Sequence, residues 1–136
     1  MPQRRIRLGS SRVNSRTQVV VIDDDLRVRE SLQSLFEASD LHARFFQSAE
    51  DFLNQQDLSG VGCLICDVKM PRMSGYDLYR LVAKTHPHIP TVFITAHADD
   101  YKAADVLASG TVTLMEKPFD GEQLLEWVKR AVRRST

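Results

Sequence analysis

Four short apolar runs in this chain each lead directly into a residue with a charged or hydroxyl side chain. The first run, Val19 to Ile22, is followed by three aspartates, and later runs lead into Asp67, Thr95 and Lys117. A short apolar run between polar residues is typical of a strand buried in a parallel sheet. Because ligands bind outside the carboxyl ends of such strands, the pattern restricts the fold and predicts one polar site at a sheet edge.

The apolar runs alternate with segments of helical periodicity. The expected strands are 19–22, 44–47, 62–66, 91–94 and 111–115. The first expected helix carries the apolar stripe Val28, Leu32, Leu35 and Phe36, and the second runs from the N-cap Ser48 to about Gln55. The third begins at Ser74, with Asp77 in a capping box, and buries Leu78, Leu81 and Val82. The fourth spans 99–108 and the last begins at Asp120. Strands that alternate with helices pair in parallel through right-handed crossovers. We therefore predict one α/β domain with a doubly wound parallel sheet.

Composition and charge exclude several classes of protein. A chain of 136 residues with no net charge is long enough to bury a core as one domain. The first sixteen residues contain no acid but five arginines, namely Arg4, Arg5, Arg7, Arg12 and Arg16. We expect this segment to be a disordered tail or leftover cloning sequence. It has no apolar stretch of the signal-peptide kind, and no run approaches the ~18 apolar residues of a membrane span, so we expect a cytoplasmic protein.

The two cysteines, Cys63 and Cys66, have the spacing of a redox or metal-binding pair. Residues three apart on a strand face opposite sides of the sheet and lie ~10 Å apart, which is too far for a disulfide. We interpret both as buried small apolar residues. The histidines also lack ligand spacing; only His97, two residues after Thr95, is expected near the site.

The predicted site brings together like charges. Asp23, Asp24 and Asp67 would repel one another, so either some of them stay protonated or a cation neutralises them. An all-oxygen site with few protein ligands suits Mg²⁺. With the charge neutralised, one carboxylate can attack a phosphorus atom while Lys117 and Thr95 stabilise the phosphoryl oxygens, which yields an aspartyl phosphate.

Four motifs resemble those of response-regulator receiver domains, the CheY-like superfamily of two-component signalling. They are Val-Ile-Asp-Asp-Asp, Cys-Asp-Val-Lys-Met-Pro-Arg-Met-Ser-Gly-Tyr-Asp-Leu, Phe-Ile-Thr-Ala-His-Ala and Glu-Lys-Pro-Phe. The resemblance as a whole spans about residues 18–134. The resemblance implies a (βα)5 flavodoxin-like fold whose five-stranded parallel sheet has the order 2-1-3-4-5. It divides the chain into a tail at 1–17, a receiver domain at 18–134 and the start of a linker at 135–136.

The resemblance also implies a role for each site residue. Asp67 is the expected phosphoacceptor. The expected Mg²⁺ ligands besides Asp67 are Asp24 directly, Asp23 mainly through a water, and the backbone carbonyl of Lys69. Thr95 and Lys117 are expected to bind phosphoryl oxygens.

Other positions of the motifs concern the backbone and the switch. Pro71 and Gly75 match the turn after the acceptor strand, where glycine permits unusual backbone angles. The Lys117–Pro118 bond is expected to be cis. Leu114 occupies the place of the aromatic residue that changes rotamer in many relatives.

The partners follow from the same resemblance. We expect the phosphoryl donor to be a phosphohistidine on a sensor histidine kinase, and the output domain to be of the LuxR-type helix-turn-helix kind and absent from this chain. The expected readout surface is the 99–108 helix, the 111–115 strand and the last helix, where phosphorylation could produce a homodimer. No membrane partner is expected. No direct nucleic-acid binding is expected either, because the basic residues do not form a compact patch in the sequence.

Two other functions are compatible with the same residues. In a haloacid-dehalogenase-like Mg²⁺ phosphatase, Asp23 would be the nucleophile and Asp25 its partner, although the chain lacks a cap or an acidic pair after Lys117. Alternatively, the chain would be an interaction module that has the same fold but is neither phosphorylated nor dephosphorylated. Taken singly, Asp23 to Asp25 also suit a helix cap, and Thr95 and Lys117 suit an ordinary strand and a solvated surface.

Overall fold

The structure is a computed structural model that describes residues 18–55, 58–96 and 112–135. The predictions for residues 1–17, for the helix 99–108 and for His97 lie outside these ranges.

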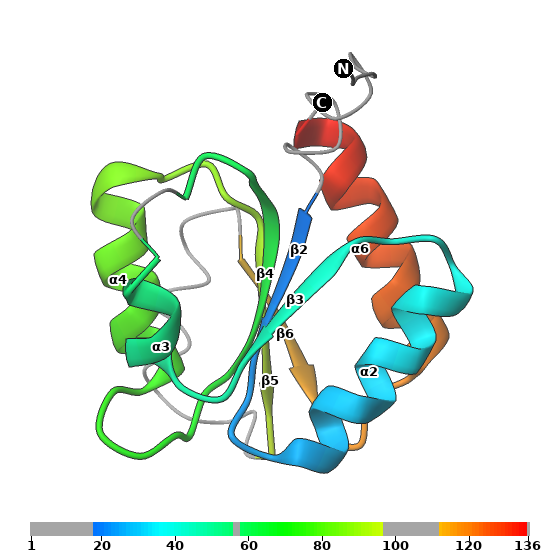
Figure 1. The fold of residues 1–136 in the computed structure, drawn as a ribbon, viewed down its shortest axis with the longest axis horizontal. Coiled ribbons are helices and arrows are strands. Elements are labelled where there is room, and N and C mark those ends of the chain that lie inside the picture. The colour runs from blue at the N-terminus through cyan, green and yellow to red at the C-terminus, as the bar shows by residue number, and fades with distance from the viewer. Residues whose placement is uncertain (1–17, 56–57, 97–111, 136) are drawn as a thin grey trace, which may run out of the picture.

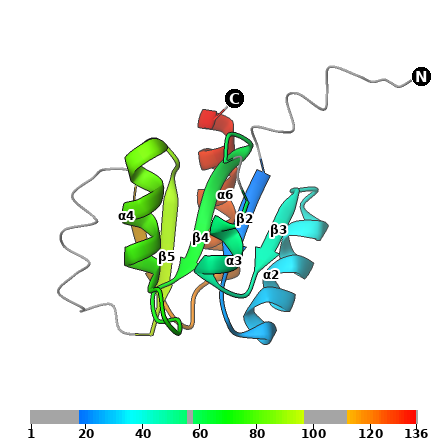
Figure 2. The same ribbon diagram turned by 60° about the vertical axis from the view of Figure 1, so that its left-hand side comes forward.

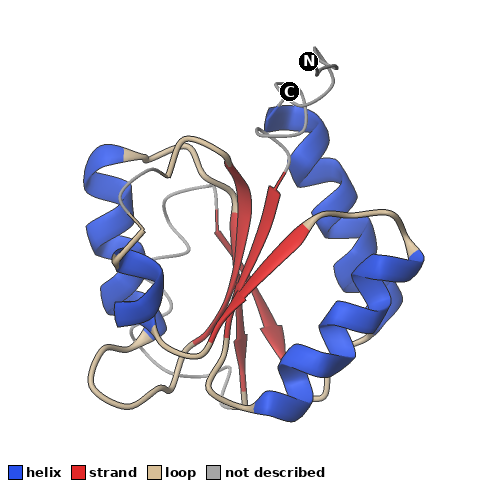
Figure 3. Cartoon of the chain, in the orientation of Figure 1, coloured by secondary structure: helices blue, strands red, loops and turns tan. Residues whose placement is uncertain are grey.

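The described chain forms one parallel sheet of five strands in the order β3-β2-β4-β5-β6 (Figure 1, Figure 3). The strands are β2 (Gln18–Ile22), β3 (Ala43–Phe46), β4 (Val61–Asp67), β5 (Thr91–Thr95) and β6 (Val112–Glu116). In chain order this is 2-1-3-4-5, so the predicted fold is confirmed, with strand ends that shift by one residue or so. Asp67 and Thr95 are the last residues of their strands.

Helices cover both faces of the sheet (Figures 1 and 2). α2 (Leu26–Ala38) and α6 (Gly121–Ser135) lie on one face, and α3 (Ala49–Leu53) and α4 (Gly75–Thr85) lie on the other. None of these described helices is long and apolar enough to cross a membrane.

Each face of the sheet has its own apolar core because successive strand residues point to opposite sides. On β2, Val19 and Val21 pack with α2 and α6, whereas Val20 and Ile22 pack with α3 and α4. The cysteines follow the same alternation: Cys63 belongs to the α2–α6 core and Cys66 to the α3–α4 core. Both are free and buried, and burial raises the pKa of the Cys63 thiol to about 12. This arrangement agrees with the interpretation of both as small apolar residues.

The predicted helix caps are present. The Ser48 side chain accepts a hydrogen bond from the Asp51 backbone N–H at 3.0 Å, and Ser74 and Asp77 form the complete capping box. The carboxylate of Asp120 accepts from the Glu122 backbone N–H at 2.9 Å, so α6 starts one residue after the predicted position.

The prediction that Leu81 is buried on α4 is wrong, because its side chain is 41% exposed. Two tyrosines rotate the buried face of the helix away from it. The rings of Tyr76 and Tyr79 pack edge-on against Phe93 of β5, with ring centroids 4.9 and 5.9 Å apart. Aromatic residues gain more from burial than leucine does, so they decide which side of α4 faces the sheet.

Candidate functional site

The polar residues that follow the apolar strands meet at one edge of the sheet, which we call the carboxyl edge. Ile22 pairs with Cys66 across β2 and β4, so the next residues, Asp23 and Asp67, lie side by side. Thr95 ends β5 on the other side of β4, where it is buried. Lys117 follows β6, and its backbone N–H donates to the Thr95 carbonyl at 2.7 Å.

Three carboxylates form a cluster at this edge. Oxygen atoms of Asp23, Asp24 and Asp67 all lie within 4.8 Å of one another. Asp23 and Asp67 are buried, whereas Asp24 is exposed and closes the cluster on the solvent side. The sequence prediction that these three residues converge is confirmed.

Lys117 provides a positive charge to the cluster. Its Nζ atom lies 3.6 Å from Oδ2 of Asp23 and 3.6 Å from Oδ2 of Asp67. The bond from Lys117 to Pro118 is cis, as the resemblance implied. One ammonium group therefore serves two buried carboxylates.

The carboxyl groups of Asp23 and Asp67 hold their protons more strongly than an ordinary aspartate does. Burial raises the pKa of Asp67 to about 6, and the charge of Asp23 adds to this effect while Lys117 opposes it. Burial also raises the pKa of Asp23, against the effects of the Asp25 backbone N–H and of Lys117. The site is thus short of positive charge.

A hard divalent cation fits this donor set. Three carboxylates within reach of one another, two of them incompletely neutralised, offer the oxygen ligands that Mg²⁺ prefers. Lys69, whose backbone carbonyl is the further predicted ligand, is exposed and lies two residues after Asp67, in the segment that follows β4.

Without a cation, we expect the stability of the chain to fall as the pH rises. Asp67 has a pKa of about 6 in the fold against an ordinary value of 3.8, so between these pH values only the folded state holds the proton. The free energy of unfolding should therefore decrease from pH 4 to pH 6 and stay lower above, and Mg²⁺ should restore it. Urea unfolding with a chelator or with Mg²⁺ measures this. Asp67→Asn is the reference: a pH profile that matches the wild type would contradict the assignment to Asp67.

The neighbouring Asp25 has a different function in the structure. Its side chain accepts a hydrogen bond from the Arg27 backbone N–H at 2.9 Å and caps α2. Its own backbone N–H donates to Oδ1 of Asp23 at 2.9 Å. Because Asp25 caps the helix, the arrangement does not favour the D-x-D pairing of the phosphatase alternative.

Gly75 is required for a reason that differs from the predicted one. It is the first residue of α4 and packs against the backbone of β4, where a Cβ atom would lie 2.3 Å from the carbonyl oxygen of Asp67. The prediction of unusual backbone angles applies to Arg72 instead, which has a φ of 68° and an ion pair of 3.5 Å with Glu50. The sequence pattern showed that glycine was needed but not that the helix approaches the site so closely.

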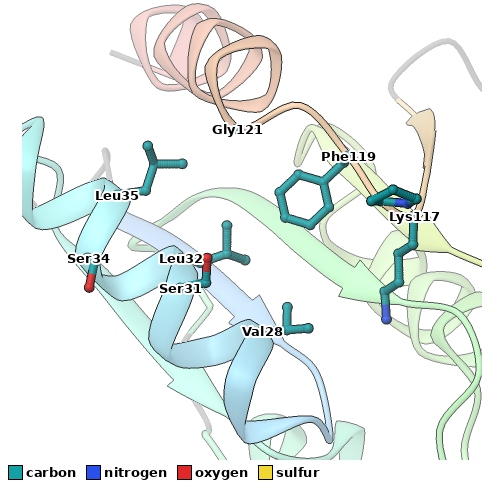
Figure 4. A pocket seen from close by; sticks show the side chains of 9 residues that line it. Val28, Ser31, Leu32, Ser34, Leu35, Lys117, Phe119 and Gly121 are labelled. Atoms are coloured by element: carbon teal, nitrogen blue, oxygen red, sulfur yellow. The ribbon is translucent and has the colours of Figure 1, made fainter.

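An apolar groove that the sequence reasoning missed lies beside the cluster (Figure 4). It has a volume of about 800 Å³ and separates α2 from the segment that joins β6 to α6. Figure 4 shows Val28, Leu32 and Leu35 on one wall, with Phe119 and Lys117 across from them. The residues were visible in the apolar stripe of α2, but the position of Phe119 depends on the path of the chain after Lys117.

Leu114 lies on β6, three residues before Lys117. The side chain is half-buried and packs against the α3–α4 core.

The chain is similar to known proteins in both sequence and fold. Residues 19–129 match the profile of the response regulator receiver domain. The chain is 38% identical over 127 residues to the response regulator protein TmoT of Ectopseudomonas mendocina, covering 93% of this chain and 58% of TmoT. It is 36% identical over 117 residues to the transcriptional regulatory protein FixJ of Azorhizobium caulinodans, covering 86% of this chain and 56% of FixJ.

The solved structure of the response regulator StyR has a TM-score of 0.79 at 33% identity, covering 87% of this chain and 60% of StyR. The chain therefore spans a little more than half the length of the curated relatives to which it is similar.

Proposed function

This chain belongs to the response regulator receiver domain family, and we propose that it accepts a phosphoryl group on Asp67 from a sensor histidine kinase. One observation carries the choice of Asp67. It ends the central strand β4, and its carboxylate lies within 3.6 Å of Lys117 in a cluster of three acids. The direct test is mass spectrometry after incubation with acetyl phosphate and Mg²⁺, which should find one phosphoryl group on the peptide that contains Asp67.

The transfer uses the residues of the carboxyl edge. A carboxylate oxygen of Asp67 forms a bond to phosphorus while the bond between phosphorus and the donor's imidazole nitrogen breaks, and the imidazole leaves. Lys117 pairs with one phosphoryl oxygen and the Thr95 hydroxyl bonds another, so negative charge on the group is neutralised. Attack of water on phosphorus would later break the bond to the Asp67 oxygen, release inorganic phosphate and restore the carboxylate, so the phosphorylated state would be temporary.

Mg²⁺ would be held by the carboxylates of Asp23, Asp24 and Asp67 and by the carbonyl of Lys69. When bound, it supplies the positive charge that allows two carboxylates and a phosphoryl group to lie together. Burial raises the pKa of both Asp23 and Asp67, and the charge of Asp23 adds to the effect on Asp67; these shifts support the proposal.

The phosphoryl group would act by shifting a conformational equilibrium. Thr95 drawn toward the phosphoryl group gives contacts that differ between two states, which is the requirement for a switch. We propose that the switch controls an output domain in the whole protein. Relatives with the name transcriptional regulatory protein support an output in transcription, which we propose to be a DNA-binding domain of the LuxR-type helix-turn-helix kind.

A protein that donates a phosphoryl group to Asp67 has to bind the surface beside this residue. The groove of Figure 4 is a suitable binding surface for such a donor. The groove is apolar and continuous with Lys117, which contacts Asp67. We propose that a helix of the sensor kinase binds there, since an apolar helix face fits such a groove.

The substitution Ser31→Arg tests this docking site because Ser31 is exposed and lines the groove. We expect phosphotransfer from a kinase that phosphorylates the wild-type chain to slow by about tenfold, while labelling by acetyl phosphate stays unchanged. Gln33→Arg adds the same charge on α2 outside the groove and should leave both rates unchanged. Equal slowing by the two substitutions would argue for a general charge effect instead.

A further inference from the structure

A side chain on α2 holds the backbone of the acidic cluster from behind. Arg29 lies in the first turn of the helix and is half-buried. Its Nη1 atom donates a hydrogen bond of 2.7 Å to the backbone carbonyl of Asp23. A hydrogen bond from a charged donor at this distance is among the stronger ones in proteins.

This bond completes the set of contacts that fix Asp23. The backbone N–H donates to the Phe46 carbonyl at 3.1 Å, and Oδ1 accepts from the Asp25 N–H at 2.9 Å. Oδ2 faces Lys117 at 3.6 Å. Asp23 comes directly after the last residue of β2, and of these contacts only the hydrogen bond to its backbone carbonyl comes from a side chain of α2.

The same carbonyl determines where Asp24 lies. It belongs to the peptide unit that joins Asp23 to Asp24, and a peptide unit is planar. Holding its oxygen restricts the orientation of the plane, and with it the position of the Asp24 Cα atom from which the side chain leaves the backbone. Asp24 is the exposed member of the cluster and is the least constrained by packing.

We propose that Arg29 is a positioning residue for the metal site: by holding the Asp23 carbonyl, it keeps the carboxylates of Asp23 and Asp24 directed toward Asp67. The inference rests on the proposed function only in that Mg²⁺ is the ion concerned. Arg29 acts through the backbone and touches neither the phosphoryl group nor the ion.

The experiment compares two arginines of the same helix in the whole chain. Arg29→Gln removes the charged donor, and Arg27→Gln makes the same change at a side chain that is 92% exposed and whose guanidinium approaches Asp25 at 4.0 Å. Titration with MgCl₂ alone, followed by calorimetry, gives the Kd. We expect Arg29→Gln to weaken Mg²⁺ binding by about tenfold, because loss of a group that orients metal ligands has an effect of this size. The Kd of Arg27→Gln should stay within about twofold of the wild type.

A second readout separates positioning from simple stabilisation. At one Mg²⁺ concentration near the wild-type Kd, the Mg²⁺-dependent rise in Tm should shrink in Arg29→Gln. An equal fall in Tm with and without Mg²⁺, or a Kd within about twofold of the wild type, would overturn the proposal.

If Arg29→Gln does not fold, Arg29→Lys replaces it. Lysine keeps the charge but is shorter and lacks the planar fork, so we expect Mg²⁺ binding about threefold weaker than in the wild type, and wild-type affinity would overturn the proposal. Because the titration contains no phosphodonor, it measures Mg²⁺ binding without phosphorylation. Failure of acetyl phosphate to label Asp67 in the wild type would count against the function and leave the Arg29 result intact.

Discussion

Asp67→Asn should abolish covalent phosphorylation of this chain by acetyl phosphate and Mg²⁺. The amide is a far poorer nucleophile than the carboxylate, and it removes one of the two acids that Lys117 contacts. We expect labelling to fall to the background of the assay, as read by intact-protein mass spectrometry. The folded state should survive, because the substitution also removes a buried carboxyl group whose pKa burial has raised.

Two companion variants make this result specific. Asp23→Asn should slow labelling without moving it from Asp67, since Asp23 belongs to the proposed cation site but is not the proposed nucleophile. Asp51→Asn, which changes an exposed acid on α3, should have no effect on labelling. Labelling that persists in Asp67→Asn and disappears in Asp23→Asn would instead identify the phosphatase-like chemistry.

Gly75→Ala should destabilise the chain and impair the site at the same time. The added methyl group would lie 2.3 Å from the Asp67 carbonyl oxygen and 3.1 Å from the Cys66 sulfur, so either α4 or the end of β4 has to move. We expect a loss of about 3 kcal/mol in the free energy of unfolding, which is the cost of a serious overpacking. This corresponds to a fall in Tm of roughly 10 °C. Displacement of Asp67 should also lower the labelling rate.

Gly121→Ala is the matched control, because both glycines are the first residue of a helix. Its methyl group would meet Leu35 at 3.7 Å, an ordinary van der Waals distance. The substitution should therefore be neutral or should stabilise the chain by up to about 1 kcal/mol through the higher helix propensity of alanine. Equal losses in the two variants would show that alanine is unfavourable at either helix start, independently of Asp67.

Most of the fold was predictable because the local signals agree with one another. Apolar strands of β-branched residues, capping residues such as Ser48 and Ser74, and alternation of strand with helix all favour one doubly wound sheet. The wrong prediction of a buried Leu81 has a physical reason. Helical periodicity shows which residues share an apolar stripe, but the contacts with aromatic residues on the sheet determine which part of the stripe is buried. That choice depends on Phe93, which is far away in the sequence.

The location of the site was predictable for a similar reason, since parallel strands carry their last residues to a common edge. Asp23, Asp67 and Lys117 lie at the carboxyl ends of strands that are neighbours or near neighbours in the sheet, and the structure brings them together. What holds these residues was not predictable. The approach of Gly75 to a carbonyl and the reach of Arg29 to another depend on backbone positions that no residue pattern specifies.

The two thiols give this protein a built-in way to follow how it opens. Cys63 is sealed beneath one helical layer and Cys66 beneath the other, so a soluble alkylating reagent reaches each sulfur only after the corresponding layer lifts from the sheet. Tandem mass spectra that resolve the two adducts would then time the departure of each layer separately. Cys66 is the neighbour of Asp67, the proposed phosphoacceptor. A comparison of the alkylation rates of the two cysteines with and without phosphorylation would therefore show whether the phosphoryl group stabilises the α3–α4 layer more than the α2–α6 layer.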